Sequence, residues 1–184
     1  MSRVYVFLAE GFEEIEGLTV VDLLRRAKIG TETVSVTGKK EVTGAHGITV
    51  TADCLFEERD FKEAEALVLP GGMPGTKNLG EHPGLAGLLS AHYAEEKIIA
   101  AICAAPSVLG QMGFLQGRVA VCYPGFESML EGAVVCSAKV AVDGNVVTSR
   151  GMGTAIDFSL KLIELLENKE LSEEISGAVL HSAF

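Results

Sequence analysis

The sequence has 184 residues, of which 48% are hydrophobic and 22% are charged, and its formal net charge is −10. This length predicts a single domain over residues 1–184 with a full hydrophobic core, and the composition excludes disordered and fibrous chains. The negative charge argues against nucleic acid and membrane surfaces as partners, and no apolar stretch approaches the roughly 20 residues of a membrane span.

Short apolar segments alternate along the chain with segments of helical periodicity. We expect strands at Val4–Ala9, Thr33–Thr37, Ile48–Ala52, Ala66–Leu69, Ile98–Ile102, Arg118–Cys122, Lys139–Val142 and Val146–Thr148. We expect helices at Ile15–Arg26, Leu85–Glu95, Ala104–Met112, Thr154–Glu167 and Leu171–Leu180. This alternation predicts an α/β fold, a doubly wound, mainly parallel sheet with helices on both faces. Ligands of such sheets bind beyond the carboxyl ends of the strands, so we expect the site on the loops there.

Cys103 stands where the expected strand Ile98–Ile102 runs directly into a helix. This is the geometry of a nucleophile elbow with Cys in place of Ser. The N–H groups and the dipole at the start of the helix favour the thiolate, which is the reactive form. The alternative is a small buried cysteine of the core, which is the usual place of a free thiol.

Two further loops carry groups that suit a reactive cysteine. Pro70-Gly71-Gly72 follows an apolar strand, and glycines there let backbone N–H groups approach a ligand; the alternative is an ordinary tight turn. Glu13, Glu14 and Glu16 crowd the start of the first helix, where the helix dipole alone favours acidic residues. Glu13 and Glu16 share one helical face, and either could move a proton if burial raised its pKa.

Other kinds of site find little support in the sequence. The four cysteines contain no CxxC pair, and we interpret them as thiols of a reducing cytoplasm. The four histidines have no metal-ligand spacing, so we expect no metal; His46, beside a glycine-rich turn, is the only one kept open. The segment Gly151–Ile156 matches only half of the GxGxxG fingerprint, and no phosphate-binding loop of the GxxxxGK[ST] type occurs, so we expect no cofactor.

Four segments together resemble one family. They are Ala9–Glu16, Leu69–Gly72, Ala101–Pro106 and Thr148–Thr154, and in this order and spacing they are similar to the ThiJ/PfpI superfamily, in the branch of the parkinsonism-associated protein deglycase and its bacterial relatives. The resemblance covers essentially the whole chain. It implies a flavodoxin-like sandwich that works as a homodimer.

The resemblance also implies roles for individual residues. Cys103 matches the reactive cysteine, Glu16 its acid partner, and Gly72 and Ala104 the backbone donors of an oxyanion cradle. We expect Glu13, Gly71 and Tyr123 to line the substrate pocket. Relatives are credited with cofactor-free conversion of methylglyoxal to lactate and with deglycation, chaperone activity and oxidative-stress sensing, so we expect an aldehyde or a glycated adduct as the ligand.

Two positions depart from the pattern of the superfamily. Ala104 stands where the peptidase-like branch has His, which argues against a peptidase or an amidotransferase. Tyr123 stands where many relatives have His before a proline, and a phenol with a pKa near 10 is a poor base at neutral pH. The sequence therefore leaves two leading hypotheses, a glyoxalase or deglycase-like enzyme and a redox sensor or chaperone with an oxidisable Cys103.

Overall fold

The described residues, 3–181 of this computed structural model, contain a seven-stranded sheet. Its strands are β1 (Val4–Leu8), β2 (Thr31–Ser35), β5 (Cys54–Leu55), β6 (Ala66–Leu69), β7 (Ile98–Ile102), β10 (Val140–Asp143) and β11 (Val146–Ser149). They lie side by side in the order β10-β11-β7-β6-β1-β2-β5. Each neighbouring pair is parallel except β10 and β11, which form an antiparallel hairpin at one edge. The expected mainly parallel sheet is confirmed.

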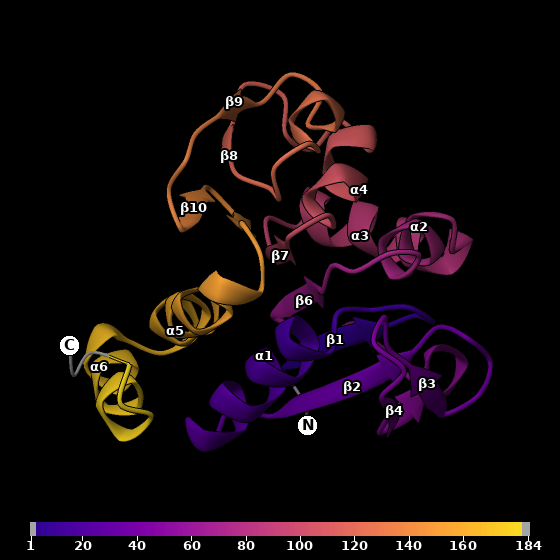
Figure 1. Ribbon diagram of the computed structural model, residues 1–184, viewed down its shortest axis with the longest axis horizontal. Helices are drawn as coiled ribbons and strands as arrows, with labels where there is room; N and C mark the ends of the chain where they lie inside the picture. The colour runs from indigo at the N-terminus through magenta and orange to yellow at the C-terminus, as the bar shows by residue number, and fades with distance from the viewer. Residues whose placement is uncertain (1–2, 182–184) are drawn as a thin grey trace.

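Helices cover both faces of this sheet. They are α1 (Glu14–Arg26), α2 (Gly75–Gly80), α3 (Pro83–Ala94), α4 (Pro106–Gln111), α5 (Ala155–Leu166) and α6 (Lys169–Ala178). Figure 1 shows α1 and α5 on one side of the strands and α2, α3 and α4 on the other, with α6 packed outside α5. The doubly wound arrangement predicted from the sequence is therefore present.

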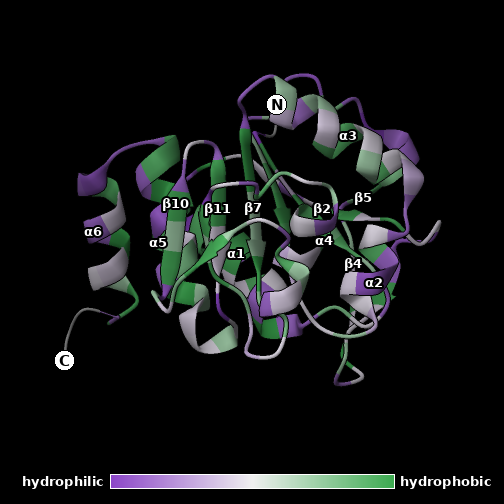
Figure 2. Ribbon diagram, turned by 90° about the horizontal axis from the view of Figure 1, so that it is seen from above, coloured by the Kyte–Doolittle hydropathy of each residue, from purple (hydrophilic) through white to green (hydrophobic). Residues whose placement is uncertain are grey.

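The alternation of side chains along the central strands explains why both faces need cover. In β1, Val4, Val6 and Leu8 belong to the core beneath α1 and α5, whereas Tyr5 and Phe7 belong to the core beneath α2, α3 and α4. Strands that are apolar on both faces are stable only between two layers. Figure 2 shows the strands mostly in the hydrophobic colour, with the hydrophilic residues concentrated on the helices and loops around them.

Two of the expected strands lie outside the main sheet. The segment Arg118–Cys122 forms only the short β8 (Val119–Ala120), which pairs in parallel with β9 (Val134–Val135). The segment Ile48–Ala52 forms β4 (Thr49–Thr51), which pairs with β3 (Glu41–Thr43) in a separate hairpin. β10 and β5 are the edge strands of the main sheet, and neither β4 nor β8 pairs with them.

The remaining differences concern short elements. The sequence did not predict α2, β3, β5 or β9, nor the 3₁₀ turns η1 (Phe56–Glu58), η2 (Glu127–Met129) and η3 (Met152–Thr154). The loops after β1, β6, β7 and β11 all begin at the carboxyl edge of the sheet, as parallel strands require. Within residues 3–181, no helix has the length and apolar character needed to cross a bilayer.

Candidate active site

Cys103 follows β7 directly and has a backbone φ of 66°, which is unusual for a residue other than glycine. Strand alternation would turn its side chain toward α4, because Ile99 and Ala101 face that side. The left-handed φ instead packs it against the core on the α1 and α5 side. The backbone is held from two directions: the Cys103 N–H donates to the Ser149 carbonyl at 3.0 Å, and the Cys103 carbonyl accepts from the Tyr123 N–H at 2.8 Å. The sharp strand-to-helix turn expected at Cys103 is present.

Glu16 lies in the first turn of α1 and is 1% exposed. Its Oε2 accepts a hydrogen bond from the Gly71 N–H at 2.9 Å. Its carboxyl group also hydrogen-bonds the thiol of Cys103. A buried carboxyl group with these two partners is held in one orientation, facing the sulfur.

The two glycines after β6 are required by close contacts. A Cβ atom at Gly71 would lie 2.5 Å from the Cβ of Cys103 and 2.7 Å from Oε2 of Glu16. Gly72 has a φ of +88°, and a Cβ there would lie 2.4 Å from the backbone nitrogen of Glu13. The N–H groups of Gly72 and Ala104 face the sulfur of Cys103 and favour its thiolate. The loop is therefore both a tight turn and a cradle of N–H groups, and the two alternatives from the sequence are compatible.

Burial changes the acid–base behaviour of both side chains. It raises the pKa of Glu16 to about 7, against the lowering effect of its hydrogen bonds with Cys103 and Gly71. Burial and the nearby ionised Glu16 raise the pKa of the Cys103 thiol to about 12, although the N–H groups of Gly72 and Ala104 lower it. The Ala104 N–H at the start of the helix favours the thiolate as expected, but desolvation and the carboxylate of Glu16 outweigh it, so the net pKa of Cys103 is raised.

Two groups this close titrate as a pair, and each proton lost belongs to the pair. The first proton leaves near the pKa of Glu16, about 7. The second leaves only at high pH, because it would place two negative charges side by side in a buried site. Between these steps the pair holds one proton, which lies mostly on Cys103; the thiolate is the minor form in which that proton has moved to Glu16.

Tyr123 lies at the mouth of the site and is half-exposed. A Cβ at Gly151 would lie 3.3 Å from the Tyr123 ring and 3.8 Å from Oε1 of Glu16, so Gly151 separates the two side chains closely. Tyr123 and Gly151 help to line a surface depression of about 250 Å³, together with Pro124, Arg150, Met152, Gly153 and Thr154. The sequence predicted Tyr123 as a pocket residue but not Gly151. The only indication of Gly151 was that it stands in a glycine-rich loop after a strand.

The three acidic residues of the first loop have different partners. Glu14 is buried and accepts hydrogen bonds from the backbone N–H of His46 at 2.8 Å and of Ile48 at 3.4 Å, and its Oε2 lies 2.9 Å from Nδ1 of His46. Glu13 approaches the same imidazole, with its Oε2 3.6 Å from Nδ1 of His46, and its charge raises the pKa of Glu16. Glu14 thus anchors the β3–β4 hairpin, and Glu13 borders the thiol site as expected.

His46, Glu13 and Glu14 bring their ligand atoms within 4.8 Å of one another. Sequence spacing missed this cluster because His46 is 32 residues from Glu14. The carboxylate of Glu14 is already engaged by two N–H groups and an imidazole nitrogen. The hydrogen bonds of Glu14 therefore explain why these three residues lie together: they hold the β3–β4 hairpin against α1.

Comparisons with known proteins agree with this site and fold. The model of the DJ-1/PfpI family matches residues 2–165. Protein DJ-1 homolog B of Arabidopsis thaliana is 35% identical over 181 residues, which are 97% of this chain and 41% of that protein. The chain therefore spans less than half the length of this relative.

Two relatives match over nearly their whole length. A deglycase of Pyrococcus abyssi is 36% identical over 169 residues, which are 90% of this chain and 99% of that one. The structure of Toxoplasma gondii DJ-1 in an oxidised form has a TM-score of 0.93 and 38% identity, and the match covers 98% of each chain.

Proposed function

The chain belongs to the DJ-1/PfpI family, and from this premise we propose that it is a cysteine-dependent, cofactor-free enzyme of the glyoxalase or deglycase type. Its substrates are small reactive carbonyls, with methylglyoxal converted to lactate, or the adducts that such carbonyls form. The observation that carries the proposal is the buried carboxyl group of Glu16 on the thiol of Cys103, beside the N–H groups of Gly72 and Ala104.

In the first step the shared proton is on Glu16 and the thiolate of Cys103 attacks the aldehyde carbon. A C–S bond forms, the carbonyl π bond breaks, and Glu16 gives its proton to the oxygen. The N–H groups of Gly72 and Ala104 stabilise the charge that develops on that oxygen. The product is a hemithioacetal, and Glu16 is now an ionised base next to it.

In the second step Glu16 takes the proton from the former aldehyde carbon and returns a proton to the neighbouring carbon. The hydroxyl proton passes from the first oxygen to the second, which leaves a lactoyl thioester on Cys103. Water hydrolyses the thioester to lactate and restores the pair with one proton. The sum is methylglyoxal plus water giving lactic acid, so no oxidant or reductant is consumed.

The test is lactate formation from methylglyoxal by the pure protein without glutathione, followed by proton NMR. We expect Cys103→Ser to lose activity at least 100-fold, since a serine hydroxyl is a far weaker nucleophile than a thiolate. Cys136→Ser is the matched control, because Cys136 is exposed and lies outside the site. Equal activity in Cys103→Ser and the unmodified protein would contradict the proposal.

A second candidate function is redox sensing through the same thiol. It is favoured by Glu16, whose carboxyl group can donate a hydrogen bond to an oxidised Cys103, and by the oxidised form of the T. gondii relative. Mass spectrometry after mild peroxide treatment tests it. The sensor hypothesis predicts oxygen on Cys103 before Cys54, Cys122 or Cys136, and fails if those three oxidise while Cys103 does not.

Chaperone activity shares this second candidate and has no separate site among residues 3–181 that we can assign. A peptidase or amidotransferase is a distant third, because Ala104 offers no imidazole next to Cys103. A cytoplasmic location remains a prediction from the unpaired cysteines.

We also propose that the protein works as a homodimer. Ile15 and Leu18 of α1 and Ile48 of the β3–β4 hairpin are exposed large apolar side chains. The hydrogen bond from the Ile48 N–H to Glu14 brings the hairpin against the start of α1, so these side chains lie near one another. A second copy that covers them would border the loop of Glu13 and Glu16.

A further inference from the structure

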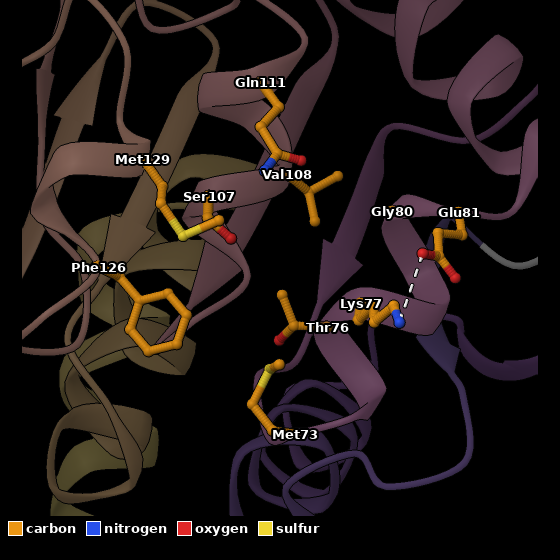
Figure 3. Close-up of a pocket in the computed structure, with 10 residues that line it drawn as sticks. All are labelled: Met73, Thr76, Lys77, Gly80, Glu81, Ser107, Val108, Gln111, Phe126 and Met129. Atoms are coloured by element: carbon orange, nitrogen blue, oxygen red, sulfur yellow. Dashed lines mark ion pairs between the residues drawn. The ribbon is translucent and has the colours of Figure 1, made fainter.

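A separate cavity of about 320 Å³ lies between α2 and α4, and the residues that line it include Met73, Thr76, Ser107, Val108, Phe126 and Met129 (Figure 3). This volume is at the lower end of the range of small-molecule sites. It opens on the helix layer formed by α2, α3 and α4. Cys103 packs against the opposite core, so the cavity does not belong to the thiol site.

The walls of the cavity are fixed by hydrogen bonds. The Thr76 N–H donates to the Gly72 carbonyl at 2.9 Å. The Ser107 hydroxyl donates to the Ala104 carbonyl at 2.7 Å, and the Phe126 N–H donates to the Tyr123 carbonyl at 3.1 Å. Each of the three segments is hydrogen-bonded to a different loop, after β6, β7 and β8, so the cavity has a preformed shape.

The hydroxyl group of Thr76 has no hydrogen-bond partner within the described residues, although its oxygen is fully buried and the residue is only 4% exposed. Leaving a buried hydroxyl unpaired is costly. Figure 3 shows this hydroxyl facing the same space as the Phe126 ring and the Ser107 hydroxyl. A ligand in the cavity would supply the missing partner.

The remaining lining defines the chemistry of that ligand. Phe126, Met73 and Met129 offer a ring and two thioethers, which contact aromatic groups favourably. The Ser107 hydroxyl already donates its proton to the Ala104 carbonyl, so it can only accept a hydrogen bond from a ligand. The Thr76 hydroxyl can accept or donate one. The charged lining residues, Lys77 and Glu81, pair with each other at 3.8 Å, so no unpaired charge faces the cavity.

We propose that this cavity binds a small neutral aromatic molecule that carries a hydroxyl or N–H group. The ring lies against Phe126, Met73 and Met129, and the polar group hydrogen-bonds Thr76 and Ser107. This site does not depend on the reactivity of Cys103, and it goes beyond the proposed carbonyl chemistry.

The experiment titrates phenol into the full chain with ¹³C-labelled methionine methyl groups. We expect the methyl signals of Met73 and Met129 to shift with saturation, while Met112 and Met152, which do not line the cavity, shift much less. Toluene, which has the ring without the hydroxyl, is expected to bind about 3- to 10-fold more weakly, the factor of one net hydrogen bond.

Two variants make the titration specific. Thr76→Val removes only the unpaired hydroxyl, so the fold is retained, and it is expected to reduce the preference for phenol over toluene. Gly80→Leu adds a side chain next to Val108, which an ideal Cβ at Gly80 approaches to 3.4 Å, and is expected to abolish binding. Cys103→Ser is expected to bind phenol as the unmodified protein does, which separates this site from the proposed enzyme.

Two results would overturn the proposal. One is that phenol shifts Met73 and Met129 no more than Met112 and Met152 up to its solubility limit. The other is that Thr76→Val leaves the ratio of phenol to toluene affinity unchanged.

Discussion

Cys103 and Glu16 form a pair in which each group controls the charge of the other. Burial holds the proton on Glu16 to about pH 7, and the carboxylate of Glu16 holds the proton on Cys103 far above its ordinary range. A lone cysteine at a helix start would instead lose its proton more easily. The reactivity of this site therefore depends on where one shared proton lies.

Gly71 is the position where a single methyl group should disturb this pair most. The added Cβ of Gly71→Ala would overlap Cys103 and Glu16, at 2.5 and 2.7 Å. We expect a loss of about 1–3 kcal/mol in the free energy of unfolding, measured by urea denaturation, and a loss of carbonyl turnover.

Gly87→Ala is the matched control for that variant. Gly87 lies inside α3 with no atom within 4 Å of an added Cβ, so alanine should stabilise the protein by about 0.5–1 kcal/mol. If Gly71→Ala and Gly87→Ala gave the same change in stability and the same turnover, the close packing of Gly71 would have no role.

The sequence could predict these site residues only in part. Cys103, Glu16 and the two glycines follow from motif and strand-end position. The contact between Gly151 and Tyr123, and that between His46 and Glu14, join segments far apart in the chain and depend on the final packing. The direction in which the pKa of Cys103 shifts could not be predicted, because the extent of burial is a property of the folded site.

The longer apolar segments of the sequence were the ones whose strands could be predicted. The expected strands Ala66–Leu69 and Ile98–Ile102 coincide with β6 and β7, which are central and apolar on both faces. The two-residue strands β5 and β9 have no periodicity to detect, and the expected strand Arg118–Cys122 shortens to the two residues of β8, because the pairing of such short strands is decided by tertiary contacts. The fold class was therefore predictable, and its short peripheral elements were not.

His92 makes α3 sensitive to acid. It is 3% exposed in the last turn of this helix, and burial, with the nearby charge of Lys97, lowers its pKa to about 4. The unfolded chain binds a proton near pH 6.5, whereas the folded chain does so only near pH 4. The neutral His92 therefore lowers the free energy of unfolding only in acid. Above pH 6.5 it has no effect of this kind, and as the pH falls from 6.5 to 4 the protein loses on the order of 2 kcal/mol of stability.

The measurement is urea denaturation at several pH values for the unmodified protein and His92→Leu. The difference in unfolding free energy between them should move in favour of His92→Leu as the pH falls from 6.5 to 4. Glu16→Gln is a control with the opposite sign, because the raised pKa of Glu16 makes stability fall as the pH rises from about 4.5 to 7. A pH-independent difference for His92→Leu would contradict the buried neutral imidazole.

At the scale of the whole molecule, the parallel sheet gathers the site. The segments that follow β1, β6, β7 and β11 supply Glu16, at the start of α1, and Gly72, Cys103 and Gly151 at one edge of the sheet. Glu16 and Gly151 are 135 residues apart in the sequence. This convergence is a property of the topology, which the alternation of strands and helices already implied.

The homodimer belongs to the same scale. Sedimentation velocity at micromolar concentration should give a dimer for the unmodified protein, and Ile15→Lys combined with Ile48→Lys should shift it to monomer, because charges would be buried in the interface. A monomer for the unmodified protein, or a dimer unaffected by both charges, would contradict the proposed interface.

The most direct test of the Cys103–Glu16 pair is the rate of Cys103 alkylation by iodoacetamide against pH, read by mass spectrometry. Sharing of one proton predicts that the rate rises through about pH 7, as the pair loses its first proton, and then levels off well below pH 9. In Glu16→Gln this step near pH 7 should disappear. A rate in the unmodified protein that stays low through pH 7 and rises only above pH 9, or a step that survives in Glu16→Gln, would contradict the account.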